Sequence, residues 1–200
     1  MADTLTHRTP LSEVLRGSVP DSAVDIVEVK DRGMIDLRGH LADRDFGGLL
    51  GVDLPSVPRT SVSHGSLTVL WLSLDQWLIT CPRGDAVALT AALQRDLQGV
   101  HSLVADVSDM RTILRVSGDG AAEVLMKGTS VDLTLADGKP GTVRRLRFAE
   151  VAAMVHALPD GKSFDLYVFR SYADYVLQYL TAAARPQAAI RLFKGSAHSA

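Results

Sequence analysis

Residues 24–39 read VDIVEVKDRGMIDLRG, and residues 103–118 read LVADVSDMRTILRVSG. Each stretch has an apolar run, a polar turn, a second apolar run and a closing glycine. The same order of features therefore returns roughly 78 residues later, which is the signature of an internal duplication. Each copy predicts a pair of strands that opens one half of the chain.

The segments that follow each strand pair also match. In the first copy residues 43–50 predict a short helix that ends at Gly51, and in the second copy residues 121–126 predict one that ends at Gly128. Strand, turn, strand and helix are then predicted over residues 67–97 and again over residues 151–184. The predicted N-caps of the helices share a short polar side chain and are Asp43, Asp85, Asp119 and Ser171.

The duplication predicts one folded unit built from two halves, residues 21–99 and residues 100–185. Residues 1–20 are predicted to form an N-terminal arm, and residues 186–200 a C-terminal tail. Strands that open as hairpins and end in helices indicate an α+β fold with mostly antiparallel sheets and helices packed on one face. Each half would be a split β-α-β unit of the ferredoxin-like kind.

Composition narrows the functional class. The chain has 200 residues, is 46% hydrophobic and carries a net charge of -2, with an isoelectric point near 6.3. It therefore lacks the basic face that nucleic-acid binding needs, and its apolar runs are far shorter than the ~20 residues of a membrane helix. Because residues 1–10 also lack the apolar core of a secretion signal, we expect a soluble cytoplasmic protein.

Residues with catalytic or ligating potential are scattered. The six histidines show neither i, i+4 pairing nor another metal-ligand spacing. The single cysteine, Cys81, excludes an internal disulfide and is expected to be a buried, inert thiol on a strand. The turn at residues 118–120 is like the start of a dinucleotide loop, but Glu123 stands at the third glycine position, where a carboxylate would repel a pyrophosphate. We therefore expect no catalytic, cofactor-binding or metal-binding residue in this chain.

Two features are candidate partner contacts. Leu11 and Leu15 lie in the arm and would stay exposed to water unless a partner covered them; a floppy arm is the alternative. Arg145 and Arg147 would share one face of a strand. They would form either a docking patch for an acidic partner or a solvated edge that prevents aggregation.

Several blocks of sequence, taken in order, carry a resemblance to a known family. They are PL (10–11), IDLRG (35–39), LWLSLDQWLI (70–79), DVSDMRTILRVSG (106–118), LMKG (125–128) and FDLYVFRSYADY (164–175). Their order and spacing resemble the gamma subunit of heterotetrameric sarcosine oxidase, from the arm to about Ala184.

Residues 106–110 also resemble the start of the folate-binding domain of the aminomethyltransferase (T-protein) family. In that family a catalytic aspartate lies in an Asp-Asp pair after a Gly-Gly turn, whereas residues 148–154 here read FAEVAAM. The family's Gly-Cys-Pro after the short helix is replaced by Gly128-Thr129-Ser130. The resemblance therefore implies that this chain keeps the scaffold but not the folate chemistry.

The resemblance implies a non-catalytic subunit that braces the folate-binding region of the alpha subunit. The complex would demethylate sarcosine oxidatively to glycine, forming hydrogen peroxide and 5,10-methylenetetrahydrofolate. FAD, FMN, NAD and tetrahydrofolate would be bound by other subunits, and the partners would be alpha, beta and delta, chiefly alpha. A stand-alone folate-binding module of the T-protein class is one alternative. A self-assembling scaffold, which would form a homodimer or a larger oligomer when isolated, is another.

Overall fold

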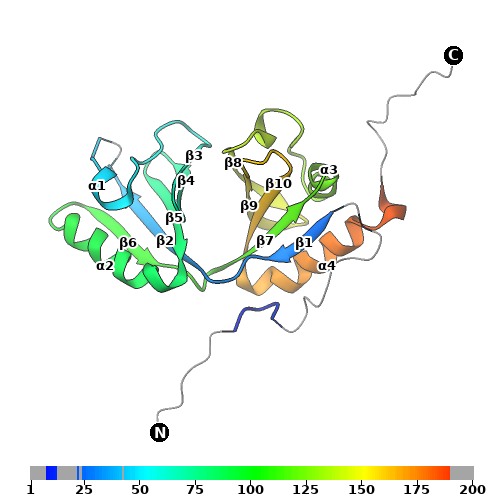
Figure 1. The fold of residues 1–200 in the computed structure, drawn as a ribbon, viewed down its shortest axis with the longest axis horizontal. Helices are drawn as coiled ribbons and strands as arrows, with labels where there is room; N and C mark the ends of the chain where they lie inside the picture. Colours follow the sequence, from blue (N-terminus) through cyan, green and yellow to red (C-terminus); the bar gives the residue numbers. More distant parts are fainter. Residues whose placement is uncertain (1–7, 13–21, 23, 42, 190–200) are drawn as a thin grey trace, which may run out of the picture.

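The computed structural model describes residues 8–12, 22, 24–41 and 43–189. Two five-stranded sheets lie side by side, and every strand pairing in them is antiparallel (Figure 1). Sheet A contains, in spatial order, β1 (Asp25–Glu28), β7 (Arg111–Ser117), β10 (Ser163–Phe169), β9 (Val151–Ala157) and β8 (Val143–Phe148). Sheet B contains β3 (Ser61–His64), β4 (Leu67–Ser73), β5 (Gln76–Pro82), β2 (Arg32–Gly39) and β6 (Ser102–Asp106). The predicted α+β class with mostly antiparallel sheets is confirmed.

Each sheet takes one strand from the other half of the chain. β1 pairs with β7, so that Ile26 lies opposite Val116, and β6 pairs with β2, so that Val104 lies opposite Leu37. The predicted opening hairpins are therefore wrong, because β1 and β2 belong to different sheets, as do β6 and β7. Sheet membership does not follow the predicted boundary between residues 99 and 100, and the exchanged strands tie the two halves together.

The four α-helices of the described residues cover the outer faces of the sheets. α2 (Ala86–Asp96) packs on β6 and β2 of sheet B, and α1 (Gly47–Leu50) lies at the same side. α3 (Ala121–Met126) and α4 (Ala173–Ala183) pack on sheet A and on each other. Short 3₁₀ turns are η1 (Arg83–Asp85), η2 (Ala136–Gly138), η3 (Arg170–Tyr172) and η4 (Pro186–Ala188).

The predicted helix ends are only partly right. Gly51 ends α1 in the left-handed conformation, with φ of 74°, as predicted. Asp85, the last residue of η1, occupies the N-cap position of α2 as predicted, whereas Asp43 lies outside α1 and Ser171 lies inside η3. None of the described α-helices has a side-chain hydrogen bond at its N-cap. Asp119 also fails as a cap, because its carboxylate pairs with Lys162 instead.

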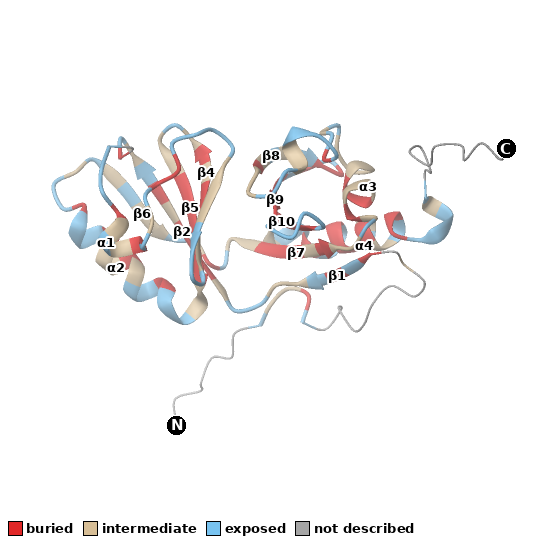
Figure 2. Ribbon diagram, turned by 45° about the horizontal axis from the view of Figure 1, so that its top comes forward, coloured by how far each residue is buried: buried red, intermediate tan, exposed pale blue. Residues whose placement is uncertain are grey.

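Three apolar clusters form the core, and Figure 2 shows buried positions along the strands and on the helix faces that meet them. One lies between sheet A and its helices, and a second between sheet B and its helices. The third joins the two sheets and consists of Met34, Leu70, Leu72, Leu78, Ile113, Val143, Met154 and Tyr167. The sheet faces that carry no helix therefore pack on each other, and we call these the inner faces.

A polar seam adds to the contact between the sheets. The backbone N–H of Val143 donates to the carbonyl of Arg59 at 2.8 Å, and Thr60 forms a bridge with Thr142. Arg59 also forms an ion pair with Asp137 at 3.0 Å. The start of β8 is therefore bonded to the chain that leads into β3, which holds the two sheets in register at this end.

Candidate functional site

Arg145 and Arg147 lie on the inner face of sheet A. Strand register sets Arg145 in a cross-strand row with Met154, Tyr167 and Ile113. Those three residues belong to the cluster between the sheets, so Arg145 shares their face, and Arg147 shares it because alternate strand residues point the same way. Both arginines are exposed. The prediction that they share one face of a strand is confirmed.

The structure adds Arg111, at the start of β7, to this face. Arg111 lies opposite Phe169 in β10, and its guanidinium carbon lies 4.7 Å from the centre of the Phe169 ring, a cation–π contact. Its Nε atom is buried and has no hydrogen-bond partner. Burial, and then the positive charge of Arg145, lower the pKa of Arg111. We call Arg111, Arg145 and Arg147 the arginine face.

Few negative charges oppose the arginine face. Arg147 forms an ion pair with Glu150 beyond the β8–β9 turn, and both side chains are mostly exposed. Arg145 has no ion pair or hydrogen bond from its side chain among the residues that the structure describes. Asp36 of sheet B acts on Arg111 electrostatically, but Gln76 donates to both oxygens of that carboxylate, at 2.9 and 3.1 Å.

The other end of the inner face brings together a serine, a histidine and an aspartate. The Oγ of Ser61 donates to the carbonyl of Gly141 at 2.9 Å and lies 2.9 Å from Nε2 of His156. When the hydroxyl proton of Ser61 goes to Gly141, Nε2 of His156 is the donor to Ser61. The contact links β3 of one sheet to β9 of the other.

His156 and Asp165 are both buried near this contact. Burial lowers the pKa of His156, and the charge of Asp165 acts in the opposite direction. Asp165 lies opposite His156 in register, but both of its oxygens accept hydrogen bonds from Arg115, at 2.7 and 2.9 Å. The arrangement is consequently a closed polar network, which strand pairing alone brings together and which no local motif could have indicated.

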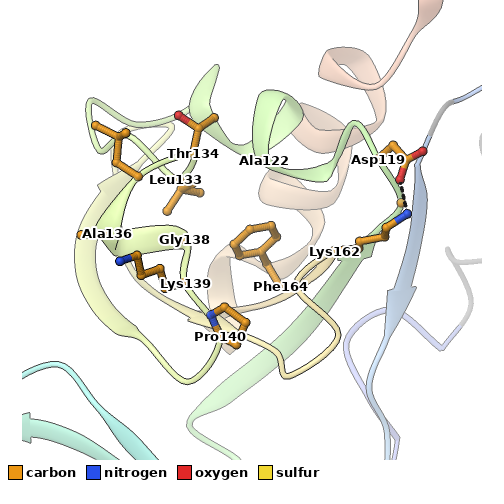
Figure 3. Close-up of a pocket in the computed structure, with 13 residues that line it drawn as sticks. Asp119, Ala122, Leu133, Thr134, Ala136, Gly138, Lys139, Pro140, Lys162 and Phe164 are labelled. Carbon is orange, nitrogen blue, oxygen red and sulfur yellow. Dashed lines mark hydrogen bonds and ion pairs between the residues drawn. The ribbon is translucent and has the colours of Figure 1, made fainter.

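A cavity of about 610 Å³ opens at the end of sheet A beside α3 (Figure 3). Phe164 lies at its floor, Asp119 and Lys162 meet at 2.7 Å on one side, and Lys139 lies on the other. The hydrogen bond from Lys162 lowers the pKa of Asp119. A carboxylate at this turn, with the acidic Glu123 in the first turn of α3, does not fit the pyrophosphate of a dinucleotide.

Other sequence-based candidates have clear positions. Cys81 is buried on β5, as predicted, and burial raises the pKa of its thiol. Within the described part of the chain, no three His, Cys, Asp or Glu side chains are grouped closely enough to hold a metal ion. None of the described helices has the length and apolarity needed to cross a membrane.

The structure tests the predicted partner contact of only one of the two arm leucines. Leu11 is fully buried in the core of sheet A, against the prediction that a partner would be needed to cover it. The carbonyl of Arg8 accepts a hydrogen bond from Arg170 at 2.7 Å, and Thr9 donates to Glu28 at 2.6 Å. These bonds anchor this part of the arm on the chain's own core. Leu15 lies outside the described residues.

Comparisons with known proteins agree on one family. Residues 38–185 match the profile of the "Sarcosine oxidase, gamma subunit family". A protein named "Sarcosine oxidase subunit gamma" from Arthrobacter sp is 30% identical over 140 residues, and one of the same name from Corynebacterium sp. (strain P-1) is 29% identical over 139 residues. Each alignment covers 65% of this chain and 66% of the relative, so the chain spans just under two thirds of their length.

Solved structures show the same fold. Heterotetrameric sarcosine oxidase from Corynebacterium sp. U-96 contains a chain that superposes with a TM-score of 0.78 at 23% identity, covering 92% of this chain and 97% of that one. Aminomethyltransferase T of the glycine cleavage system from Bartonella henselae gives 0.59 at 17% identity, covering 80% and 45%. With a family profile that matches most of its length, this chain belongs to the sarcosine oxidase gamma subunit family.

Proposed function

We propose that this chain is the gamma subunit of a heterotetrameric sarcosine oxidase and that it acts by docking rather than by chemistry. The observation that carries the second part is the β8–β9 turn. Glu150 is the acid of the stretch 148–154, yet its side chain is 78% exposed and pairs with Arg147. A carboxyl group that is to act as a general acid or base is instead tuned by burial or by a reacting partner.

The complex would convert sarcosine to glycine by oxidative demethylation, with hydrogen peroxide and 5,10-methylenetetrahydrofolate as further products. FAD, FMN and NAD would be held by the larger subunits and tetrahydrofolate by alpha, and the complex would be cytoplasmic. This chain would brace the folate-binding region of alpha. Its resemblance in fold to aminomethyltransferase T supports this role by analogy of fold alone.

Copurification tests this proposal. The tagged chain is expressed together with the alpha-like subunit of the same organism, and the captured material is weighed by mass spectrometry. We expect an equimolar complex, and a colourless isolated chain to which tetrahydrofolate gives no heat of binding. Bound flavin, or tetrahydrofolate binding by the isolated chain, would overturn the docking role in favour of a folate-binding module. A stable homo-oligomer that captures no alpha-like subunit would overturn it in favour of a self-assembling scaffold.

A further inference from the structure

We propose that the arginine face binds an acidic segment of the partner subunit. This inference rests on the proposed function, because it assigns a surface and a chemistry to the docking of this chain. It adds Arg111, a residue from β7, to the two β8 arginines, and it removes Leu11 from the contact because the chain's own core buries that side chain.

The arginines lie on either side of a shared apolar floor. Arg111 stands on β7, whereas Arg145 and Arg147 stand on β8, with β10 and β9 between these strands. Adjacent strands are about 4.8 Å apart, so the floor is three strand spacings wide. Ala152, opposite Arg147, is exposed and small, and Phe169 lies beneath the guanidinium of Arg111. The floor therefore has a small exposed side chain next to Arg147 and an aromatic ring next to Arg111.

The charge of this surface is only partly compensated within the described chain: Arg147 pairs with Glu150 and Asp36 acts on Arg111, whereas Arg145 has no partner. Alternate positions on the four strands place Arg111 and Ile113, Tyr167 and Phe169, Ala152 and Met154, and Arg145 and Arg147 on the inner face at this end. None of these eight described residues is an acid. The next row contains Asp165, but Arg115 occupies both of its oxygens. Among the described residues, the exposed guanidinium of Arg145 therefore lacks a carboxylate partner and is open to one from another chain.

The same geometry favours a polypeptide over a small anion. Guanidinium groups bind carboxylates through two parallel hydrogen bonds, and three of them spread along two strands match carboxylates spaced along a chain. The floor of Ala152 and Phe169 also offers apolar contact between the charges, as interface centres commonly do. The rival role, a solvated charged edge that prevents aggregation, requires no particular partner.

Charge reversal tests the surface in the complex with the alpha-like subunit. Arg145→Glu is compared with Arg95→Glu, which makes the same change in net charge at an exposed arginine of α2 on the opposite side of sheet B. We expect Arg145→Glu to weaken binding at least tenfold and Arg95→Glu to change it less than twofold. The affinity of the Arg145→Lys variant for the alpha-like subunit should lie between those of wild type and Arg145→Glu. Because residue 145 is exposed, the melting temperatures of all variants should match that of wild type.

Three outcomes would overturn the inference. If Arg145→Glu binds the alpha-like subunit within twofold of wild type, the surface is wrong while the proposed function stands. If wild type captures no alpha-like subunit, the proposed function fails and the inference fails with it. A ten-residue poly-glutamate peptide should compete with the partner, whereas free glutamate at the same carboxylate concentration should not; equal competition would indicate a small-anion site instead.

Discussion

Arg115 and Asp165 lie directly opposite each other on β7 and β10 and are joined by two parallel hydrogen bonds. Nε of Arg115 donates to Oδ1 at 2.7 Å, and Nη2 donates to Oδ2 at 2.9 Å. Only 7% of the Asp165 side chain is exposed, compared with 38% of the Arg115 side chain. The hydrogen bond that Arg115 donates to Asp165 raises the pKa of Arg115. The pair is therefore unequal, because only the arginine has an alternative partner in solvent.

This difference in exposure predicts that replacing Arg115 and replacing Asp165 lower the free energy of unfolding by different amounts. Arg115→Met should lower the free energy of unfolding by about 2–3 kcal/mol, because it leaves a buried carboxylate without its donors. Asp165→Asn should cost about 1 kcal/mol, because the partly exposed guanidinium can reach water. Urea unfolding of both variants checks this order. Equal losses would mean that the desolvation of Asp165 does not govern the pair.

His156 predicts a pH dependence of stability. Because burial holds the pKa of His156 below its ordinary 6.5, the unfolded chain takes up a proton near pH 6.5 while the folded chain stays neutral. The unfolded state then binds more protons, so the free energy of unfolding falls as the pH drops below about 6.5, by at most about 1.4 kcal/mol per pH unit, until the folded-state pKa is reached. The full contribution is present above pH 6.5.

Unfolding titrations of wild type and His156→Gln isolate this contribution. Glutamine keeps an N–H donor for Ser61 but does not titrate, so subtracting the two pH profiles removes the effect of all other groups. We expect wild type to lose more stability than His156→Gln between pH 7.5 and 5.5. Profiles that run parallel would show that the environment of His156 does not disfavour its charged form.

Local pattern was sufficient to predict most strands and helices. β2 buries Ile35 and Leu37 toward the helices and turns Asp36 and Arg38 to the inner face, and this alternation is visible in the sequence. The exchange of β1 and β6 could not be predicted in the same way. Val24 and Ile26 are buried in sheet A, but their apolar character would suit burial in either sheet, and only long-range pairing selects β7 over β2.

The arginine face shows the same limit. Arg145 and Arg147 could be assigned to one face because they lie on one strand. Arg111 could not be added, because the register of β7 with β10 and of β9 with β8 decides which side of the sheet it shares with them. Leu11 was wrongly assigned to a partner interface. An apolar side chain in an arm is expected to be buried, but the sequence does not show whether a partner or the chain's own core buries it.

Leu11→Ala should destabilise the isolated chain by about 2–4 kcal/mol, because Leu11 is fully buried in the core of sheet A. Leu74→Ala is the matched control, since Leu74 is 81% exposed at the β4–β5 turn and should change stability by less than about 0.5 kcal/mol. Chemical unfolding of both variants in the absence of any partner checks the assignment. If the isolated Leu11→Ala chain were as stable as wild type, Leu11 would not be part of the chain's own core and would again be a candidate partner contact.

Gly128 predicts a second packing defect. A Cβ atom at this position would lie 2.6 Å from the Phe148 ring, which is fully buried and stacks edge-on with Tyr179. Gly128→Ala should therefore cost about 1–3 kcal/mol through overpacking. At Gly48, in α1, a Cβ atom would meet nothing within 4 Å, so Gly48→Ala should be neutral or stabilise by up to about 1 kcal/mol. Calorimetric melting of both variants would contradict this account if the two shifts had the same sign and size.

The exchanged strands predict that neither half folds well alone. Residues 1–99 contain β1 without its partner strand β7, and Val24 and Ile26 without most of the core cluster in which they are buried; full burial of each such side chain contributes about 1.5–3 kcal/mol. Residues 100–200 contain β6 without β2. Because domains are typically stable by only 5–15 kcal/mol, each fragment should give a poorly dispersed NMR spectrum, and mixing them should restore a dispersed one. Two fragments that each fold independently, with spectra unchanged on mixing, would show that the exchange contributes little to the stability of either sheet.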